Sequence, residues 1–182
     1  MNPPRLASST SPTLSLFFRD SMIYNVALLS FVLGSAAGNP EIWLNDYPPD
    51  IKAKFGAINP KAKRQGYLLI IPFLLVSMGG AIWSTVRLRQ QNGGTLSFQN
   101  AYAHTFGMVM SFWLTDLLLV DWLVFATWTP AIFVLPGTEG MAGYKDYGFH
   151  LREHLRAAPA LAIVSIVLTL LALAMPTPPP SK

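Results

Sequence analysis

The chain has 182 residues, of which 52% are hydrophobic and only 12% are charged, and its formal net charge is +4. A soluble domain has about a quarter of its residues charged, because charge keeps its surface in water. This composition excludes an ordinary soluble globule and indicates the lipid bilayer as the surroundings of the chain. The basic residues flank apolar stretches and form no run with interleaved aromatics, which argues against nucleic acid as a partner. The absence of cysteine excludes disulfides, a thiol nucleophile and cysteine-bound metals.

Four apolar stretches predict an all-α integral membrane protein, a four-transmembrane-helix bundle with two interfacial loops. Each stretch approaches the roughly 20 mostly apolar residues that cross a bilayer as a helix. Pro40, Pro130 and Pro176 stop three of them, and Pro72 is expected to kink the second from inside. A single transmembrane domain over 14–176 is predicted between a disordered N-terminal tail, 1–13, and an extended C-terminal tail, 177–182, with spans at about 14–38, 66–86, 101–128 and 157–175.

Four spans put both chain termini on the same side of the cell membrane. The two long connections, 39–65 and 129–156, then share the other side, and both mix charged residues with proline and aromatics, as interfacial loops do. Basic residues close to the span ends are more frequent on the long-loop side, so the positive-inside rule favours long loops in the cytoplasm. These residues are Lys61, Lys63, Arg64, Arg152 and Arg156 on the long-loop side, against Arg19, Arg87 and Arg89 on the terminal side.

The third span carries three residues with possible chemistry: His104, Asp116 and Asp121. No Lys or Arg lies deep in any predicted span to neutralise the two carboxylates. An ionised carboxylate at mid-bilayer costs about 2.5–3.5 kcal/mol, so each Asp should be protonated, hydrogen-bonded to a neighbouring helix, or in contact with water or an ion. Two interpretations are open: an ion or proton path through these three residues, or interhelical hydrogen bonds that serve packing alone.

Helical geometry is expected to separate these three residues. At about 100° per residue, small residues of the third span form a stripe toward a neighbouring helix, and His104 projects within the same sector. Asp121 lies beside that sector, whereas Asp116 lies well round on the other side and is expected to contact a different helix or another protomer. Small residues let helices approach closely in lipid, and the predicted packing residues are Gly34, Gly38, Gly107 and Ser111.

The pair His150 and His154 is a candidate metal site, because residues four apart on a helix can offer two imidazoles to one ion. The third span ends on the same side of the membrane, which brings Asp121 toward them, and two histidines with one carboxylate suit iron, zinc or manganese. His104 lies toward the opposite end of the bundle and is not expected to join. The alternative is an amphipathic juxtamembrane helix whose histidines sit at the interface.

The spacing His150-x-x-Glu153-His154 also resembles the inverted zinc-protease motif, in which the glutamate is the general base. The resemblance covers five residues. The downstream carboxylate ligand of that family is missing here, because no Asp or Glu follows Glu153. This departure argues against a zinc protease and leaves a simpler metal site.

Three functional hypotheses remain. The first is a non-enzymatic transporter-like unit that uses the intramembrane carboxylates, either as a homo-oligomer or as an accessory subunit of a larger membrane complex. The second is a membrane-embedded enzyme that depends on a metal ion or haem and uses His150, His154 and Asp121 on a lipidic substrate. The third is a structural scaffold. Phosphate loops, nucleotide fingerprints and a Ser-His-Asp set are absent from the sequence.

Overall fold

The computed structural model describes residues 12–176; it is 84% helical and has no strand among those residues. Within this range, four helices are long and apolar enough to cross a membrane. This confirms the all-α class predicted from the sequence and supports its multi-pass character. The four are α1 (Pro12–Gly38), α3 (Pro60–Gln91), α4 (Phe98–Thr115) continued by the π-helix η2 (Asp116–Trp128), and α5 (Tyr147–Ala174). Short helices in the two long connections are η1 (Pro40–Asp46), α2 (Pro49–Phe55), η3 (Ala131–Phe133) and η4 (Ala142–Lys145).

Side-chain caps set where three of the membrane helices begin. Asn59, Ser97 and Asp146 precede α3, α4 and α5, and each accepts a hydrogen bond from a backbone N–H of the first turn. With these caps, α3 starts at Pro60 rather than at 66, and α5 starts at Tyr147 rather than at 157. Both helices therefore include polar turns that lie outside the predicted apolar spans.

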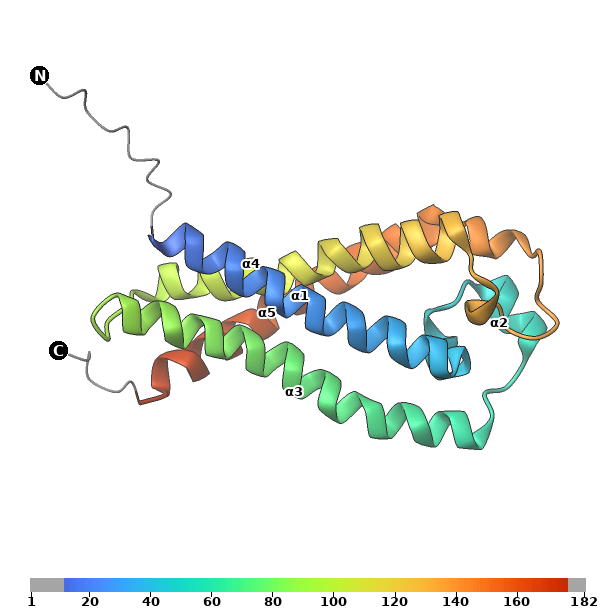
Figure 1. Cartoon of the computed structure of the whole chain (residues 1–182), viewed down its shortest axis with the longest axis horizontal. Helices are drawn as coiled ribbons and strands as arrows, with labels where there is room; N and C mark the ends of the chain where they lie inside the picture. The colour runs from blue at the N-terminus through green and yellow to red at the C-terminus, as the bar shows by residue number, and fades with distance from the viewer. Residues whose placement is uncertain (1–11, 177–182) are drawn as a thin grey trace, which may run out of the picture.

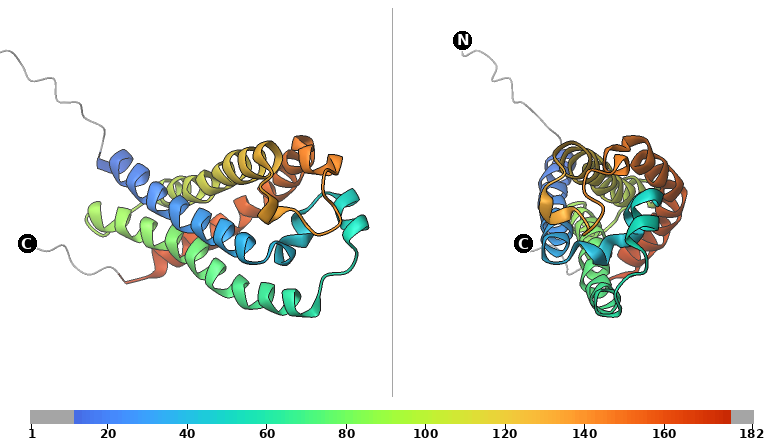
Figure 2. Two further views of the ribbon diagram at one scale, coloured as in Figure 1. Left: turned by 45° about the vertical axis from the view of Figure 1, so that its right-hand side comes forward. Right: turned by 90° about the vertical axis from the view of Figure 1, so that its right-hand side faces the viewer.

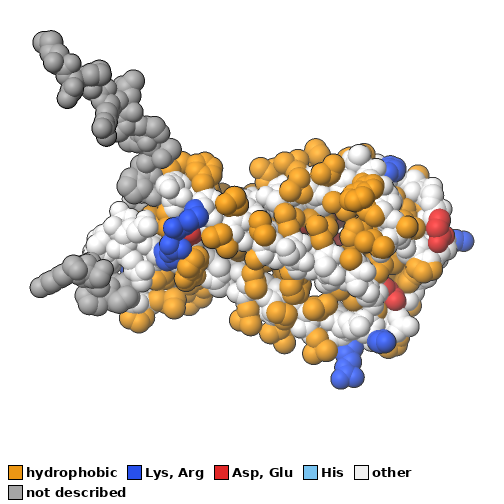
Figure 3. Space-filling model, viewed as in Figure 1, with side chains coloured by type: hydrophobic (Ala, Val, Ile, Leu, Met, Phe, Trp, Pro, Cys, Tyr) orange, Lys and Arg blue, Asp and Glu red, His pale blue; other side chains and the backbone are white. Residues whose placement is uncertain are grey.

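The two ends of the helix bundle differ (Figure 1). One end holds the start of α1, the end of α5 and the connection between α3 and α4, and the two long connections lie at the other end. Hydrophobic side chains cover much of the visible flank, while charged side chains gather toward the ends (Figure 3). The predicted tails, 1–13 and 177–182, lie outside the described residues apart from Pro12 and Thr13, which begin α1.

Helices α3 and α5 meet at one end of the bundle and diverge toward the other (Figures 1 and 2). Where they meet, the Arg89 guanidinium of α3 donates to the carbonyl oxygens of Ala172 at 3.0 Å and Met175 at 2.6 Å. These carbonyls belong to the C-terminal end of α5, where helical partners are lacking and a cation is favourable. This contact holds α3 and α5 together at one end of the bundle. The two helices diverge toward the end that carries the long connections, and the pair is called the V below.

The two long connections fold together into a small unit over the open end of the bundle, called the cap below (residues 39–59 and 129–146). The Tyr47 hydroxyl donates to the Phe133 carbonyl at 2.8 Å, and the Asp50 carboxylate accepts from the Gly143 N–H at 3.0 Å. These bonds join one connection to the other, and η1 is held with Asp46 toward the bundle. The buried core of the cap consists of Leu44, Tyr47, Ile51, Leu135 and Tyr144.

A layer of buried apolar side chains closes the middle of the bundle. Small residues allow the helices to approach here: an added Cβ at Gly80 would lie 2.8 Å from the Tyr24 ring, and one at Gly107 would lie 3.0 Å from the Phe17 ring. Such close approach is how helices associate in lipid, where there is no hydrophobic drive between them. The members of this apolar layer are Tyr24, Leu28, Ala81, Met108 and Leu168.

The predicted packing residues fall into two groups. Gly107 faces Phe17 of α1. Ser111 accepts a hydrogen bond from the Asn25 side chain at 3.2 Å, also across the contact between α1 and α4. By contrast, an added Cβ at Gly34 or Gly38 would meet no atom within 4 Å. The small residues at which the helices approach each other thus belong to α3 and α4.

We predict that Gly143→Ala destabilises the cap. A Cβ at this position would overlap the Asp50 carboxylate, so the hydrogen bond between the two residues must break or the backbone must shift. The expected cost is about 1–3 kcal/mol, measured as a fall in the thermal unfolding midpoint of the purified protein in detergent.

Gly79→Ala is the matched control. Gly79 lies within α3, and an added Cβ there would meet nothing within 4 Å. Alanine forms helix better than glycine by roughly 0.5–1 kcal/mol, so this variant should be slightly more stable than the wild type. Equal midpoints for the two variants would contradict the role assigned to the contact between Gly143 and Asp50.

Candidate functional site

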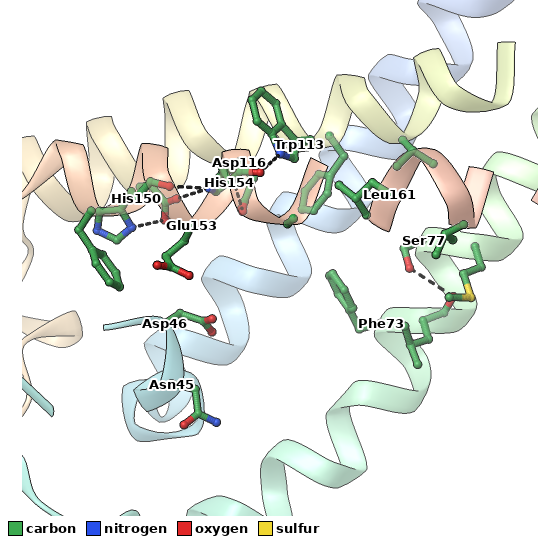
Figure 4. Close-up of a pocket in the computed structure, with 18 of the residues that line it drawn as sticks. Asn45, Asp46, Phe73, Ser77, Trp113, Asp116, His150, Glu153, His154 and Leu161 are labelled. Carbon is green, nitrogen blue, oxygen red and sulfur yellow. Dashed lines mark hydrogen bonds and ion pairs between the residues drawn. The ribbon is translucent and has the colours of Figure 1, made fainter. Parts of the chain in front are cut away.

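Helix α5 and the continuation of α4 bring two histidines and two aspartates into contact. Asp121 on η2 uses both of its oxygens: Oδ1 lies 3.3 Å from Nδ1 of His150, and Oδ2 lies 3.3 Å from Nδ1 of His154. Oδ2 of Asp116 lies 3.6 Å from Nε2 of His154. The four side chains form one continuous group, called the Asp–His cluster below. Figure 4 labels three of them, Asp116, His150 and His154. The structure therefore brings Asp121, His150 and His154 into contact and adds Asp116; the ligand atoms that lie close enough for one ion belong to Asp116, Asp121 and His154, without His150.

The π-helical backbone of η2 explains why Asp116 joins this cluster. In an α-helix two residues five positions apart point about 140° away from each other. A π-helix closes its turn with hydrogen bonds between residues five apart, such as that from the Thr129 N–H to the Val124 carbonyl at 2.8 Å. Asp116 and Asp121 are therefore turned toward one face, and both contact His154. The expectation that the two aspartates face different neighbours is wrong for this reason.

Hydrogen bonds fix the orientation of the His154 ring. Nδ1 lies 3.2 Å from the carbonyl oxygen of His150 and 3.3 Å from Asp121, both acceptors, so we assign the ring hydrogen to Nδ1. The indole of Trp113 packs edge-on against the ring, with centroids 5.3 Å apart, and its N–H donates to the His154 carbonyl at 3.0 Å. Nε2 then presents its lone pair in a fixed direction, which is what a metal ligand requires.

His150 is the most buried member of the cluster, with a side chain that is 6% exposed. The rings of Phe125 and Phe149 lie 5.1 Å and 5.3 Å from its ring. Among the described residues its Nε2 has no hydrogen-bond partner, and a buried polar atom without one costs free energy. Its Nδ1 lies 3.3 Å from Asp121. His150 therefore acts on the cluster by orienting the Asp121 carboxylate.

The Asp–His cluster lines a cavity of about 620 Å³ inside the V between α3 and α5. Toward the cap the cavity is lined by polar residues, among them Asp46, Lys52 and Glu153. Away from the cap its walls are apolar, with side chains such as Phe73 and Leu161 (Figure 4). A mostly apolar cavity of this size with a few convergent polar groups is the usual form of a small-molecule site.

Asp46 is the carboxylate that η1 contributes to this cavity. Its side chain is accessible, but the surrounding cavity walls replace much of its water. This desolvation raises the pKa of Asp46 from 3.8 to about 6, and the negative charges of Asp121 and Asp116 add to the rise. Lys52 and His150 act in the opposite direction. Asp46 therefore exchanges a proton near neutral pH, beside the Asp–His cluster.

His104 lies in a different polar group, beyond the apolar layer. Its Nε2 lies 2.8 Å from the Ser84 hydroxyl, which donates to Asp20 at 3.0 Å. Asp20 is 2% exposed and pairs with Arg87 at 3.3 Å. The bundle thus holds two polar clusters, one on each side of the layer that contains Met108 and Leu168. The structure does not bring His104 to Asp116 or Asp121.

Comparisons with protein-family profiles, curated proteins and solved structures return no match for this chain. Its function is therefore inferred from the geometry of the site.

Asp46 and Trp113 belong to the site although the sequence did not mark them as site residues. Asp46 approaches the cluster only because the cap folds over the bundle, and no local pattern encodes that contact. Trp113 lies three positions before Asp116, and its N–H is polar within an apolar span. These two features could have marked it as a residue of the site. A buried indole usually needs a hydrogen-bond acceptor, which here is the carbonyl of His154.

We predict that Asp121→Asn lowers the pKa of Asp46. Removing the neighbouring negative charge favours the ionised form of Asp46, so its pKa should fall from about 6 but stay above 3.8, because the desolvation remains. In the wild type Asp46 loses its proton as the pH rises through about 6. The measurement is a pH titration of the carboxyl infrared band, assigned with Asp46→Asn.

Glu139→Gln serves as the control, since Glu139 lies in the cap and its charge is not among those that act on Asp46. It should leave the titration unchanged. An Asp46 pKa that stays about 6 in Asp121→Asn would show that the two carboxylates do not interact.

Proposed function

We propose that this chain is a membrane-embedded, metal-dependent enzyme whose divalent ion is held by Asp116, Asp121 and His154. One observation carries the proposal: each of these residues offers a ligand atom, and the three atoms lie within 4.8 Å of one another. All three side chains are partly buried and line the same cavity. The sequence hypothesis placed the metal on His150, His154 and Asp121; the proposal keeps His154 and Asp121 as ligands, adds Asp116, and gives His150 a supporting role instead.

The spacing of the cluster supports an ion between its members. Two ligands bound at about 2.0–2.2 Å in a near-tetrahedral arrangement lie about 3.3–3.6 Å apart. Nε2 of His154 and Oδ2 of Asp116 are 3.6 Å apart. His154 also carries its hydrogen on Nδ1, which leaves Nε2 free to bind. Asp116 already faces Nε2, whereas the Asp121 carboxylate faces Nδ1 and would have to turn one oxygen toward the ion to complete the site.

Charge also favours a divalent ion. Two ionised carboxylates inside a helix bundle are costly unless they are paired. A protonated His154 compensates one negative charge, whereas a divalent ion compensates both Asp116 and Asp121. Two carboxylates with an imidazole suit manganese, iron or zinc among the common divalent ions. We therefore propose one of these three.

Three protein ligands leave coordination positions for water and substrate, as in catalytic zinc sites. An ion here would act as a Lewis acid toward a substrate oxygen or lower the pKa of a bound water. Asp46, whose pKa is raised first of all by desolvation, is suited to accept and return the proton in such a reaction. His150 would keep Asp121 in its binding orientation.

The alternative of an ion or proton path through His104, Asp116 and Asp121 stays a prediction, as do the homo-oligomer, the accessory subunit and the scaffold. The apolar layer between His104 and the Asp–His cluster favours chemistry on one side of the membrane over passage through it. The cytoplasmic location of the long loops is likewise a proposal. It would put the site on the cytoplasmic side, next to the cap.

The test is the metal content of the purified full chain. The protein is stripped with chelator, reloaded separately with Zn²⁺, Mn²⁺ and Fe²⁺, desalted and analysed by mass spectrometry for bound metal. We expect one equivalent of at least one of these ions in the wild type. His154→Ala and Asp116→Asn should each bind at least tenfold more weakly, and His150→Ala should lose about 10–100-fold in affinity because it orients a ligand.

His104→Ala is the control, since it removes a buried histidine of the same bundle outside the cluster. It should bind metal like the wild type. Full metal retention in both His154→Ala and Asp116→Asn, or no binding of any of the three ions by a folded wild type, would refute the proposed site.

A further inference from the structure

The apolar half of the cavity is open toward the outside of the bundle between α3 and α5. Helix α3 contributes Leu74 and Met78 to its wall, and α5 contributes Leu161 and Val164. Leu74 is 39% exposed and Met78 is 37% exposed, so side chains that line the cavity are also accessible from outside the bundle. Helices α3 and α5 diverge along this part of the bundle (Figure 1), and residues of both line the cavity.

The opening lies within the segments that are apolar enough to cross a membrane. Residues 74–78 belong to the candidate span Pro60–Gln91, and residues 161–164 belong to the candidate span Tyr147–Ala174. In a bilayer this side of the bundle meets hydrocarbon, where lipid chains and not water are the available molecules. A molecule that enters here must therefore present an apolar part to the cavity.

The cavity is polar at one end and apolar at the other, as an amphiphile is. The cap end carries Lys52 and Glu153, the Asp–His cluster follows, and the far end is formed by apolar side chains that include Leu168. The Lys52 ammonium is held near the cavity, where it donates to the Asn45 carbonyl at 3.0 Å. A head group with oxygen atoms fits the first part, and a hydrocarbon chain fits the second.

We propose that the substrate is an acyl-chain amphiphile. Its chain enters between α3 and α5 and lies along Leu161, Val164 and Leu168, and its head group reaches the Asp–His cluster. This inference rests on the proposed function, because the bound ion is what takes the head-group oxygen. It goes beyond that function by naming the substrate class and its route of entry, which is lateral from the membrane.

The experiment uses a palmitic acid analogue with a diazirine in the middle of its chain. The metal-loaded full chain in lipid nanodiscs is illuminated with this probe, digested and analysed by peptide mass spectrometry, with and without excess palmitic acid. We expect competed labelling on the segments 73–78 and 161–168. Val164→Trp and Leu74→Trp, which fill the cavity from opposite walls, should each reduce that labelling at least fivefold.

Two neighbouring positions provide matched controls. Val167 is 52% exposed and Leu75 is 69% exposed, and neither lines the cavity. Val167→Trp and Leu75→Trp should label like the wild type. Melting curves and metal content identify any variant that fails to fold. If one of the two cavity variants fails, the labelling of the other one tests the inference.

Equal labelling in the cavity variants and their controls, or labelling that excess palmitic acid does not reduce, overturns the inference. If the same protein binds one equivalent of metal, the proposed function stands and only the substrate class is refuted. Competed cavity labelling in a folded protein that binds no metal refutes the proposed function instead, and with it the metal-bound head group.

Discussion

A carboxylate inside an apolar helix bundle must be protonated or find a cation or hydrogen-bond donors, and this requirement determines where the polar residues of this chain gather. Asp20 contacts Arg87 and the Ser84 hydroxyl, which in turn contacts His104. Asp116 and Asp121 contact the histidines of α5. The apolar layer lies between the two clusters, and the contact of Asn25 with Ser111 places one polar pair in the same part of the bundle. Between α3 and α5, the Asp–His cluster lines a cavity.

The membrane helices could be predicted from the sequence because their signal is composition over a long window. Apolar stretches of this length allow few structures other than spanning helices. The starts of α3 and α5 agree less well with the predicted spans. Capping by Asn59 and Asp146 adds polar turns to these helices, which hydropathy alone assigns to loops. That difference affects function, because it places His150 and His154 on α5. Their spacing of four residues then puts both side chains on one face of the helix.

The composition of the site was only partly predictable. The pairing of Asp121 with His150 and His154 follows from the side on which the third span ends, and no fine geometry is needed for it. The position of Asp116 depends on the hydrogen-bond period of η2, and a sequence read at 100° per residue assumes the α-helical period. The residues of 116–128 carry no sequence signal for a π-helix. The prediction therefore placed Asp116 on the wrong face of the third span. Asp46 depends on the packing of one loop against another, through contacts such as Tyr47 with Phe133.

The two clusters differ in one respect that bears on function. Asp20 has a protein cation within reach, since Arg87 lies 3.3 Å away, and its charge is therefore balanced without any ligand. In the described part of the chain, the ion pairs of Asp116 and Asp121 are with His150 and His154 alone. An imidazole is positive only when it is protonated, so without bound protons or an ion these two carboxylates are unbalanced. The unbalanced cluster is also the one that lines the cavity, so the demand for a cation and access for a substrate coincide at one place. A purely structural polar group needs neither, which is why the Asp–His cluster, and not the one around His104, is the place where chemistry is expected.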